Sequence, residues 1–178
     1  MKALVVCLLA VVAACGEGRA IFNIDAHSFM AGSGKDTIPY LIPPATSASA
    51  STFQRLTLPP GFGSSSVDSV RITSGNANLI NAGGTGSIGF EIFFAADSAG
   101  TMTAPPALSI PTTNVSGAAT FPVVIAGDVS SVVDSLFTQE SLWMRIAANG
   151  TNGGATPVTG KGVITALQIR VVIKDKIF

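Results

Sequence analysis

Apolar and polar residues alternate with a period of two along most of the chain, which is typical of half-buried β-strands. The clearest case is 87–96, where Ile88, Phe90, Ile92 and Phe94 fall on one face. Phe93 lies on the opposite face, which predicts partial cover there as well. The same alternation predicts strands over 22–30, 37–42, 53–58, 67–73, 119–126, 141–148 and 162–174, with a short one over 107–110.

Segments rich in glycine, proline, serine or asparagine separate these strands and are predicted to be turns and loops. Pro39 and Pro122 lie inside two of the strands, and a proline cannot donate to a sheet, so both strands are expected at sheet edges. The strand over 162–174 is long and apolar enough to be central in its sheet. The predicted loops cover 31–36, 43–52, 74–86 with a few paired residues around Leu79 and Ile80, most of 97–118, and 149–157.

One segment departs from the period of two and predicts a short helix over 128–139. Asp128 is a suitable N-cap, because its carboxylate can accept amide protons of the first turn. The spacing i, i+3, i+4, i+7, i+8 of an amphipathic helix is met by Val129, Val132, Val133, Leu136 and Phe137.

About eight strands and a single helix predict an all-β fold. Strands rarely alternate with helices, which excludes a parallel α/β sheet. The alternation fits antiparallel sheets that each have one solvated face. We therefore expect one antiparallel two-sheet β-sandwich over 21–178, with the jelly roll as one form of it. These 158 residues suffice for a single domain with a sizeable core.

The chain begins with the three-part layout of a secretory signal peptide. Lys2 supplies a positive charge, 3–12 is an unbroken apolar run, and Ala13 and Ala14 are small. A membrane-spanning helix needs about 20 apolar residues, so this run is too short to be a good permanent span. We expect residues 1–14 to be removed.

Val12-Ala13-Ala14-Cys15 resembles the lipobox of bacterial lipoproteins. The resemblance covers only residues 1–15. It implies cleavage between Ala14 and Cys15, acylation of the Cys15 thiol by a palmitate-like lipid, and a membrane-anchored, extracytoplasmic protein with a short tether over 15–20. Gly16, where retained lipoproteins have aspartate, favours the outer membrane or cell surface. The alternative is a plain secreted protein cut near Ala14.

Charge and cysteine content exclude several classes of partner and site. Ten basic and ten acidic residues cancel, and loss of Lys2 leaves a net charge of −1. This balance argues against a nucleic-acid partner and against binding anionic lipid by charge. Only two cysteines exist, Cys7 and Cys15, so the folded domain has no disulfide and no cysteine metal site. No cofactor is expected.

Few residues carry recognisable chemistry. Asp25 and His27 would share the polar face of the first strand, where a carboxylate and an imidazole side by side could bind a metal or move a proton, but a simple exposed polar face is the favoured explanation. Tyr40 and Trp143 are candidates for a sugar-stacking platform. Asp97, Asp128 and Asp134 are isolated carboxylates that a calcium site across the fold would need.

The sequence favours a non-enzymatic binding, adhesive or structural role, with a carbohydrate or protein surface ligand. One alternative is a homo-oligomeric surface subunit that assembles by strand exchange at its open edges, with Arg19 as a processing point. The other is a carbohydrate-active hydrolase. Only three glutamates exist, and no catalytic pair is identifiable from the sequence.

The lipobox makes a direct prediction. Cys15→Ser removes the acylated thiol, so the protein is expected to lose its acyl label and to enter the soluble fraction. Metabolic labelling with palmitate and membrane fractionation measure both changes, with Cys7→Ser as the control that leaves 12–15 intact. A Cys15→Ser protein that remains labelled and membrane-bound contradicts the lipoprotein interpretation.

Overall fold

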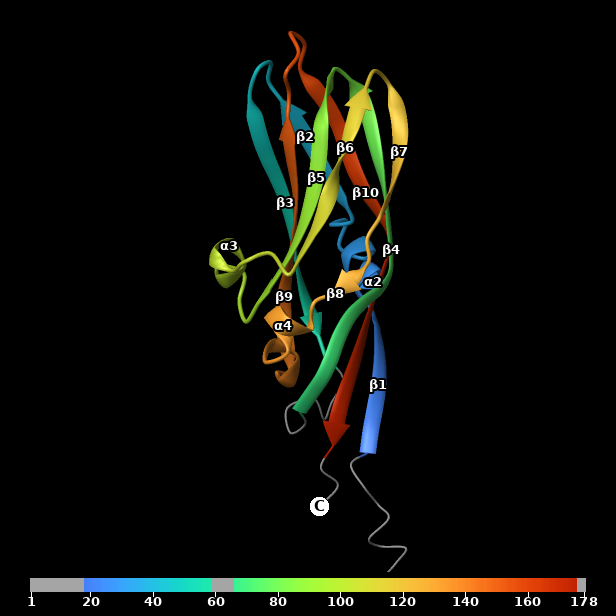
Figure 1. The fold of residues 1–178 in the computed structure, drawn as a ribbon, viewed down its shortest axis with the longest axis vertical. Helices are drawn as coiled ribbons and strands as arrows, with labels where there is room; N and C mark the ends of the chain where they lie inside the picture. The colour runs from blue at the N-terminus through green and yellow to red at the C-terminus, as the bar shows by residue number, and fades with distance from the viewer. Residues whose placement is uncertain (1–17, 59–65, 176–178) are drawn as a thin grey trace, which may run out of the picture.

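The protein folds as two antiparallel β-sheets packed face to face in an elongated body (Figure 1). The computed structural model describes residues 18–58 and 66–175. The predicted cleavage and lipid-attachment residues, Ala14 and Cys15, lie outside the described residues.

The larger sheet, sheet A, has the strand order β1–β10–β4–β7, with β2 added to β10 and β8 added to β4. The smaller, sheet B, has the order β3–β9–β5–β6. Sheet A consists of β1 (Gly18–Asp25), β2 (Thr37–Ile42), β4 (Ser66–Gly83), β7 (Ala119–Val124), β8 (Gly127–Asp128) and β10 (Val158–Asp175). Sheet B consists of β3 (Ser47–Thr57), β5 (Thr85–Ala95), β6 (Leu108–Ser116) and β9 (Ser141–Thr151).

The strand order is that of a jelly roll. Apart from β1 and the two-residue β8, the sheets read β2–β10–β4–β7 and β3–β9–β5–β6, which is the eight-stranded arrangement of two Greek keys. The antiparallel sandwich predicted from the alternation is therefore confirmed. So are the central place of the last strand, β10, and the edge places of the two proline-containing strands, β2 and β7.

The core lies between the two inner faces. Ile88, Phe90, Ile92 and Phe94 of β5 are all exposed by 2% or less, as their spacing predicted. From sheet A, alternate residues of β10 such as Leu167 are equally buried. Each side chain of this size contributes about 1.5–3 kcal/mol when fully buried, so the paired inner faces are the main source of stability.

The helix predicted over 128–139 is present as two short pieces, α4 (Ser130–Val133) and η2 (Leu136–Thr138). Asp128 is not the N-cap as expected, because Val129 occupies that position, but its carboxylate still accepts the amide proton of Ser130, the first helical residue, at 3.0 Å. Serine and β-branched valine favour helix weakly, so packing decides the backbone of so short a segment. Val133 and Phe137, one from each piece, reach the core with no exposed surface.

Two further helices, α2 (Ala26–Ala31) and α3 (Gly100–Thr103), were not predicted. The strand expected over 22–30 was wrong beyond Asp25, because the Asp25 carboxylate accepts the Ser28 amide proton at 3.2 Å and starts α2. Ala26 and Met30, four residues apart, are then buried on one face of that helix. A spacing of four fits both a strand and a helix, which is why the alternation extended too far.

The loop predicted over 74–86 was wrong, because β4 continues to Gly83 and turns into β5 at Gly84, where φ is +80°. Asn81 is the polar residue that the strand buries, with 2% of its surface exposed. It accepts a hydrogen bond from the Tyr40 hydroxyl at 3.2 Å and donates to the Gly117 carbonyl at 2.6 Å. Distant partners therefore make a buried asparagine tolerable. Strands also replace parts of three other predicted loops, since β3 begins at Ser47, β6 continues to Ser116 and β9 continues to Thr151.

β1 begins and β10 ends at the same end of the molecule, the lower end in Figure 1. Gly18 pairs directly with Asp175. Residues 18–20, which were expected to belong to the tether, are therefore the first residues of β1. Among the described residues, none of the helices has the length and apolar character needed to cross a membrane.

Phe137 ties the 128–139 segment to the core through an edge-to-face contact with Phe94, with ring centroids 5.9 Å apart. Phe137→Ala is expected to lower the free energy of unfolding by about 3–5 kcal/mol, because it leaves a cavity in a closed core. Phe29→Ala, at a side chain 37% exposed on α2, should cost about 1 kcal/mol or less. Urea denaturation of both variants measures the difference, and equal losses would contradict the assignment.

Candidate functional site

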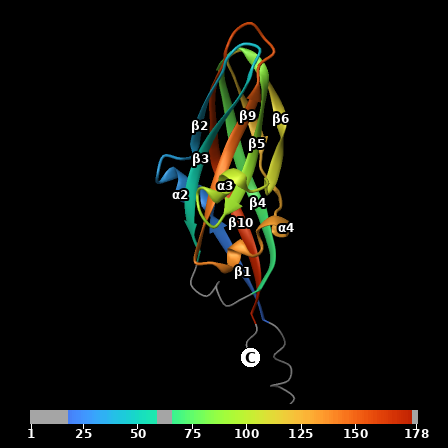
Figure 2. The same ribbon diagram turned by 90° about the vertical axis from the view of Figure 1, so that its left-hand side faces the viewer.

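The outer face of sheet B is divided into a covered and an uncovered half. Figure 2 views this face and shows α3 lying over β5 and β9, while their upper parts carry no helix. An open depression of about 430 Å³ lies in the uncovered half. We call the side chains that line it the distal polar face: Ser47, Ser49, Ser87, Thr112, Asn149 and Thr151.

Strand register assembles the distal polar face from residues that are far apart in the sequence. Ser47 of β3 and Ser87 of β5 both pair with Thr151 of β9, which forms one row across the sheet. Ser49 pairs with Asn149 in the next row, where Gly89 of β5 has no side chain to fill the space. The depression is therefore a direct result of small side chains facing outward in two adjacent rows.

Two hydrogen bonds fix side chains of the distal polar face and leave some of its polar atoms without a partner among the described residues. Asn149 Nδ2 donates to Glu91 Oε2 at 2.6 Å, and the hydroxyls of Ser87 and Thr151 lie 2.8 Å apart. Within the described residues, Asn149 Oδ1 and Glu91 Oε1 accept no hydrogen bond. The face therefore presents fixed but unused acceptors beside hydroxyl groups that can both donate and accept.

Arg145 forms the border between the open half and the part under α3. Only 8% of Arg145 is exposed, and its guanidinium carbon lies 3.6 Å from the centre of the Phe93 ring. Its Nε donates to the Thr101 carbonyl of α3 at 3.0 Å. Burial lowers the pKa of Arg145, and the nearby Glu91 carboxylate opposes that shift. The predicted cover over Phe93 is thus confirmed, and Arg145 attaches α3 to the sheet.

The proposed aromatic platform does not form. Tyr40 lies on the inner side of sheet A, 7% exposed, where burial raises the pKa of its hydroxyl. Trp143 lies on β9, directly opposite Arg55 of β3, in the other sheet. Because the two rings belong to different sheets, they cannot contact one ligand together.

The Asp25–His27 hypothesis also changes, because the strand on which it relied ends between them. Asp25 caps α2, and His27 is a half-buried residue of that helix. Within 18–58 and 66–175, the histidine, cysteine and carboxylate side chains form no group of three that could hold a metal ion. Arg19, the suggested processing point, lies in β1 and forms an ion pair with Asp68 at 3.5 Å.

The three isolated aspartates have separate structural roles. Asp97 accepts the Gly100 amide proton at 2.6 Å at the start of α3. Asp128 forms an ion pair with Arg71 at 3.0 Å. Asp134 follows α4, with one carboxylate oxygen buried and without a hydrogen-bond partner in the described structure, and burial raises its pKa.

The distal polar face itself was missed, although the sequence contains a signal for it. Residues 47–51 read Ser-Ala-Ser-Ala-Ser and lie in a segment predicted to be a low-complexity loop. The serines face outward, while Ala48 and Ala50 are half-buried against the core. The segment has the period of two that is typical of a strand. Serine and alanine differ little in hydropathy, however, so the alternation is too weak to identify a strand from the sequence.

Replacing Arg145 tests whether it holds α3 in place. Arg145→Ala should lower the free energy of unfolding by about 2 kcal/mol, since it removes a charged hydrogen bond and a ring contact. The control is Arg55→Ala on the neighbouring strand. Within 18–58 and 66–175 the exposed Arg55 side chain bonds only to the Ser141 hydroxyl, so its loss should change stability by about 0.5 kcal/mol or less. Chemical denaturation measures both, and an Arg145→Ala protein as stable as the control contradicts this role.

No family model matches the chain, and no curated protein matches it significantly. Among solved structures, it is similar to that of infectious bursal disease virus Gx strain, with 12% identity, a TM-score of 0.35, and coverage of 90% of this chain and 33% of that one. It is also similar to TmCBM61 in complex with beta-1,4-galactotriose, with 10% identity, a TM-score of 0.31 and coverage of 90% of both chains. The chain spans about a third of the length of the viral chain. At such identities and TM-scores the likeness carries no information on ligand or activity.

Proposed function

We propose that this protein is a non-enzymatic binding module whose distal polar face takes a carbohydrate. The supporting observation is the open depression of about 430 Å³, whose mainly apolar surface is bordered by the hydroxyl and amide groups of serine, threonine and asparagine side chains. Sugar hydroxyls donate and accept hydrogen bonds, and serine, threonine and asparagine side chains do the same. Asn149, fixed by Glu91, is the central specificity group because its carbonyl oxygen remains available.

The same residues argue for binding rather than hydrolysis. A glycosidase uses two carboxyl groups about 5–9.5 Å apart on either side of the scissile bond. Glu91, the carboxylate beside the depression, is hydrogen-bonded to the Asn149 amide. The Glu91 carboxylate therefore orients the Asn149 amide, which is a role in binding and not in catalysis.

We further propose that a lipid on Cys15 holds the module at an extracytoplasmic bacterial membrane surface, at the outer membrane or cell surface. Two or three acyl chains anchor a protein stably, because each buried CH₂ contributes about 0.8 kcal/mol. β1 begins at Gly18, only three residues after Cys15, and the depression lies toward the opposite end of the long axis, where β3 begins and β9 ends (Figure 1). An anchor at Cys15 would therefore present the distal polar face away from the bilayer.

Glycan binding by this face is directly testable. A glycan array identifies a ligand, and calorimetry then compares variants with the wild-type protein. Asn149→Ala is expected to weaken binding about tenfold or more, because a ligand hydroxyl loses its hydrogen-bond partner. Asn76→Ala, at an exposed asparagine on β4 of sheet A, should bind as the wild type does. If no glycan binds, or if both variants bind equally, the distal polar face is not a carbohydrate site.

A further inference from the structure

Two arginines lie opposite each other on the outer face of sheet A. Arg71 of β4 is the register partner of Arg170 of β10. Like charges directly opposite each other in a ladder are destabilising. Between them lies a hollow of about 330 Å³ whose lining contains two guanidinium groups, two hydroxyls and no carboxylate: Ser69, Arg71, Thr73, Arg170 and Val172.

The same sheet shows how such a pair is otherwise compensated. Arg19 of β1 is the register partner of Lys174 of β10, which also places two cations side by side. Here Asp68 bridges them, 3.0 Å from Lys174 Nζ and 3.5 Å from an Arg19 nitrogen. The hydrogen bond from Lys174 and the two positive charges lower the pKa of Asp68. Arg170 has no such carboxylate, and among the described residues its side chain forms no ion pair and no hydrogen bond.

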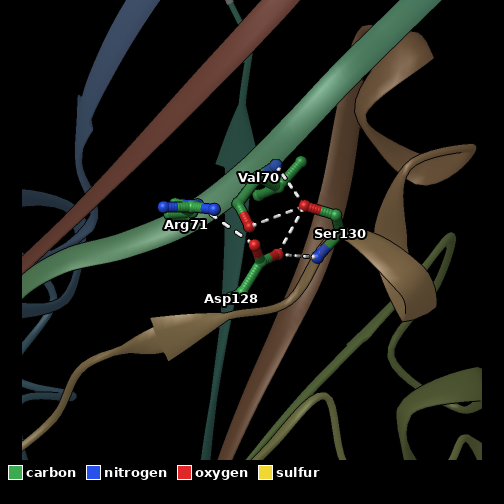
Figure 3. A network of polar contacts seen from close by, with 4 residues as sticks. All are labelled: Val70, Arg71, Asp128 and Ser130. Carbon is green, nitrogen blue, oxygen red and sulfur yellow. Dashed lines mark hydrogen bonds and ion pairs between the residues drawn. The ribbon is translucent and has the colours of Figure 1, made fainter.

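Arg71 is oriented by a network that leaves most of its donors unused. Figure 3 shows Arg71 Nε bonded to Asp128 Oδ2, at 3.0 Å, with the rest of the guanidinium directed away from Asp128. Asp128 is fixed in turn by the Ser130 hydroxyl, at 2.6 Å, and by the Ser130 amide, and these bonds lower its pKa. The Val70 amide donates to the same Ser130 hydroxyl at 2.9 Å. The carboxylate therefore holds one edge of Arg71 and leaves both terminal amino groups to a ligand.

We propose that this hollow binds a tetrahedral oxyanion, a phosphate or sulfate group, between Arg71 and Arg170. A guanidinium presents its N–H donors in a planar fork that matches such oxygens. The bound anion offsets the repulsion between Arg71 and Arg170, as the Asp68 carboxylate offsets the repulsion between Arg19 and Lys174. The hydroxyls of Ser69 and Thr73 supply further donors from the lining.

The oxyanion could come from a lipid headgroup or from a soluble or glycan-borne group. The hollow lies beside β1, since Asn23 of β1 is the other register partner of Arg170. It is on a different sheet from the distal polar face, so the two sites are independent, and loss of glycan binding would not affect this proposal.

The test uses the full chain in vesicles of neutral phosphatidylcholine, titrated with inorganic phosphate against sodium chloride of equal ionic strength. Phosphate should raise Tm by roughly 3 °C at a tenfold excess over Kd, and chloride should not. Phosphate should also shift the NMR signal of the Arg170 Nε–H, which is assigned by its absence in Arg170→Gln.

Arg170→Gln should lose phosphate affinity about tenfold or more. Without phosphate at low salt it should melt no lower than the wild type, because the opposed charges are gone. Arg55→Gln, at the exposed arginine of sheet B, should retain wild-type phosphate affinity. An equal phosphate response in Arg170→Gln and wild type overturns the proposal.

Vesicles of anionic phosphatidylglycerol, without added phosphate, show whether the bound oxyanion comes from a lipid headgroup or from a soluble or glycan-borne group. A shift of the Arg170 signal in these vesicles supports the proposal and identifies a lipid headgroup. A shift only with added phosphate supports it and identifies a soluble or glycan-borne group. No shift of Arg170 under either condition overturns the proposal.

Discussion

The pairing of β4 with β10 is the constraint on which the rest of the fold depends. Both strands contain 18 residues, and their ladder runs from Ser66 opposite Lys174 to Gly83 opposite Thr159. Four register shifts interrupt it, and such bulges bend a strand and re-aim its side chains. The shifts allow two long strands to keep apolar residues against sheet B. The remaining strands of sheet A then attach along the two free edges of this pair, β1 and β2 on β10, β7 and β8 on β4.

Because both inner faces are filled by the core, polar chemistry is restricted to the outer faces. Sheet B carries small uncharged side chains toward one end of the molecule, and sheet A carries arginine, lysine and aspartate near β1. The exposed ion pairs contribute little energy, since an exposed pair is typically worth 1 kcal/mol or less. Their effect is orientation: Asp128 and Asp68 fix where neighbouring cations point. A nearly neutral chain therefore still has two outer faces of different character.

Sequence patterns predicted the architecture better than the sites. The alternation in β5 and β9 was sufficient to predict buried strands, and the prolines of β2 and β7 were sufficient to predict edge strands. Both signals can be read from a few neighbouring residues. Asn81 was read as loop because its partners, Tyr40 and Gly117, are distant in sequence. His27 was read as part of the first strand, although the Asp25 side chain caps α2 and so ends that strand. The distal polar face and the Arg71–Arg170 hollow depend on register between strands up to about a hundred residues apart, which no local window contains.

The pairing of Gly18 with Asp175 has a mechanical consequence for a chain held at its N-terminus. β1 runs from the lower end of the molecule toward its middle, antiparallel to β10. A pull on Gly18 along the long axis, opposed by a load at the far end, draws β1 lengthwise past β10. Hydrogen bonds in such a ladder stand perpendicular to the strands, so this shear loads the rungs from Gly18 to Asp25 together rather than one after another. A pull applied at Gly18 would therefore meet resistance from the whole β1–β10 ladder at once.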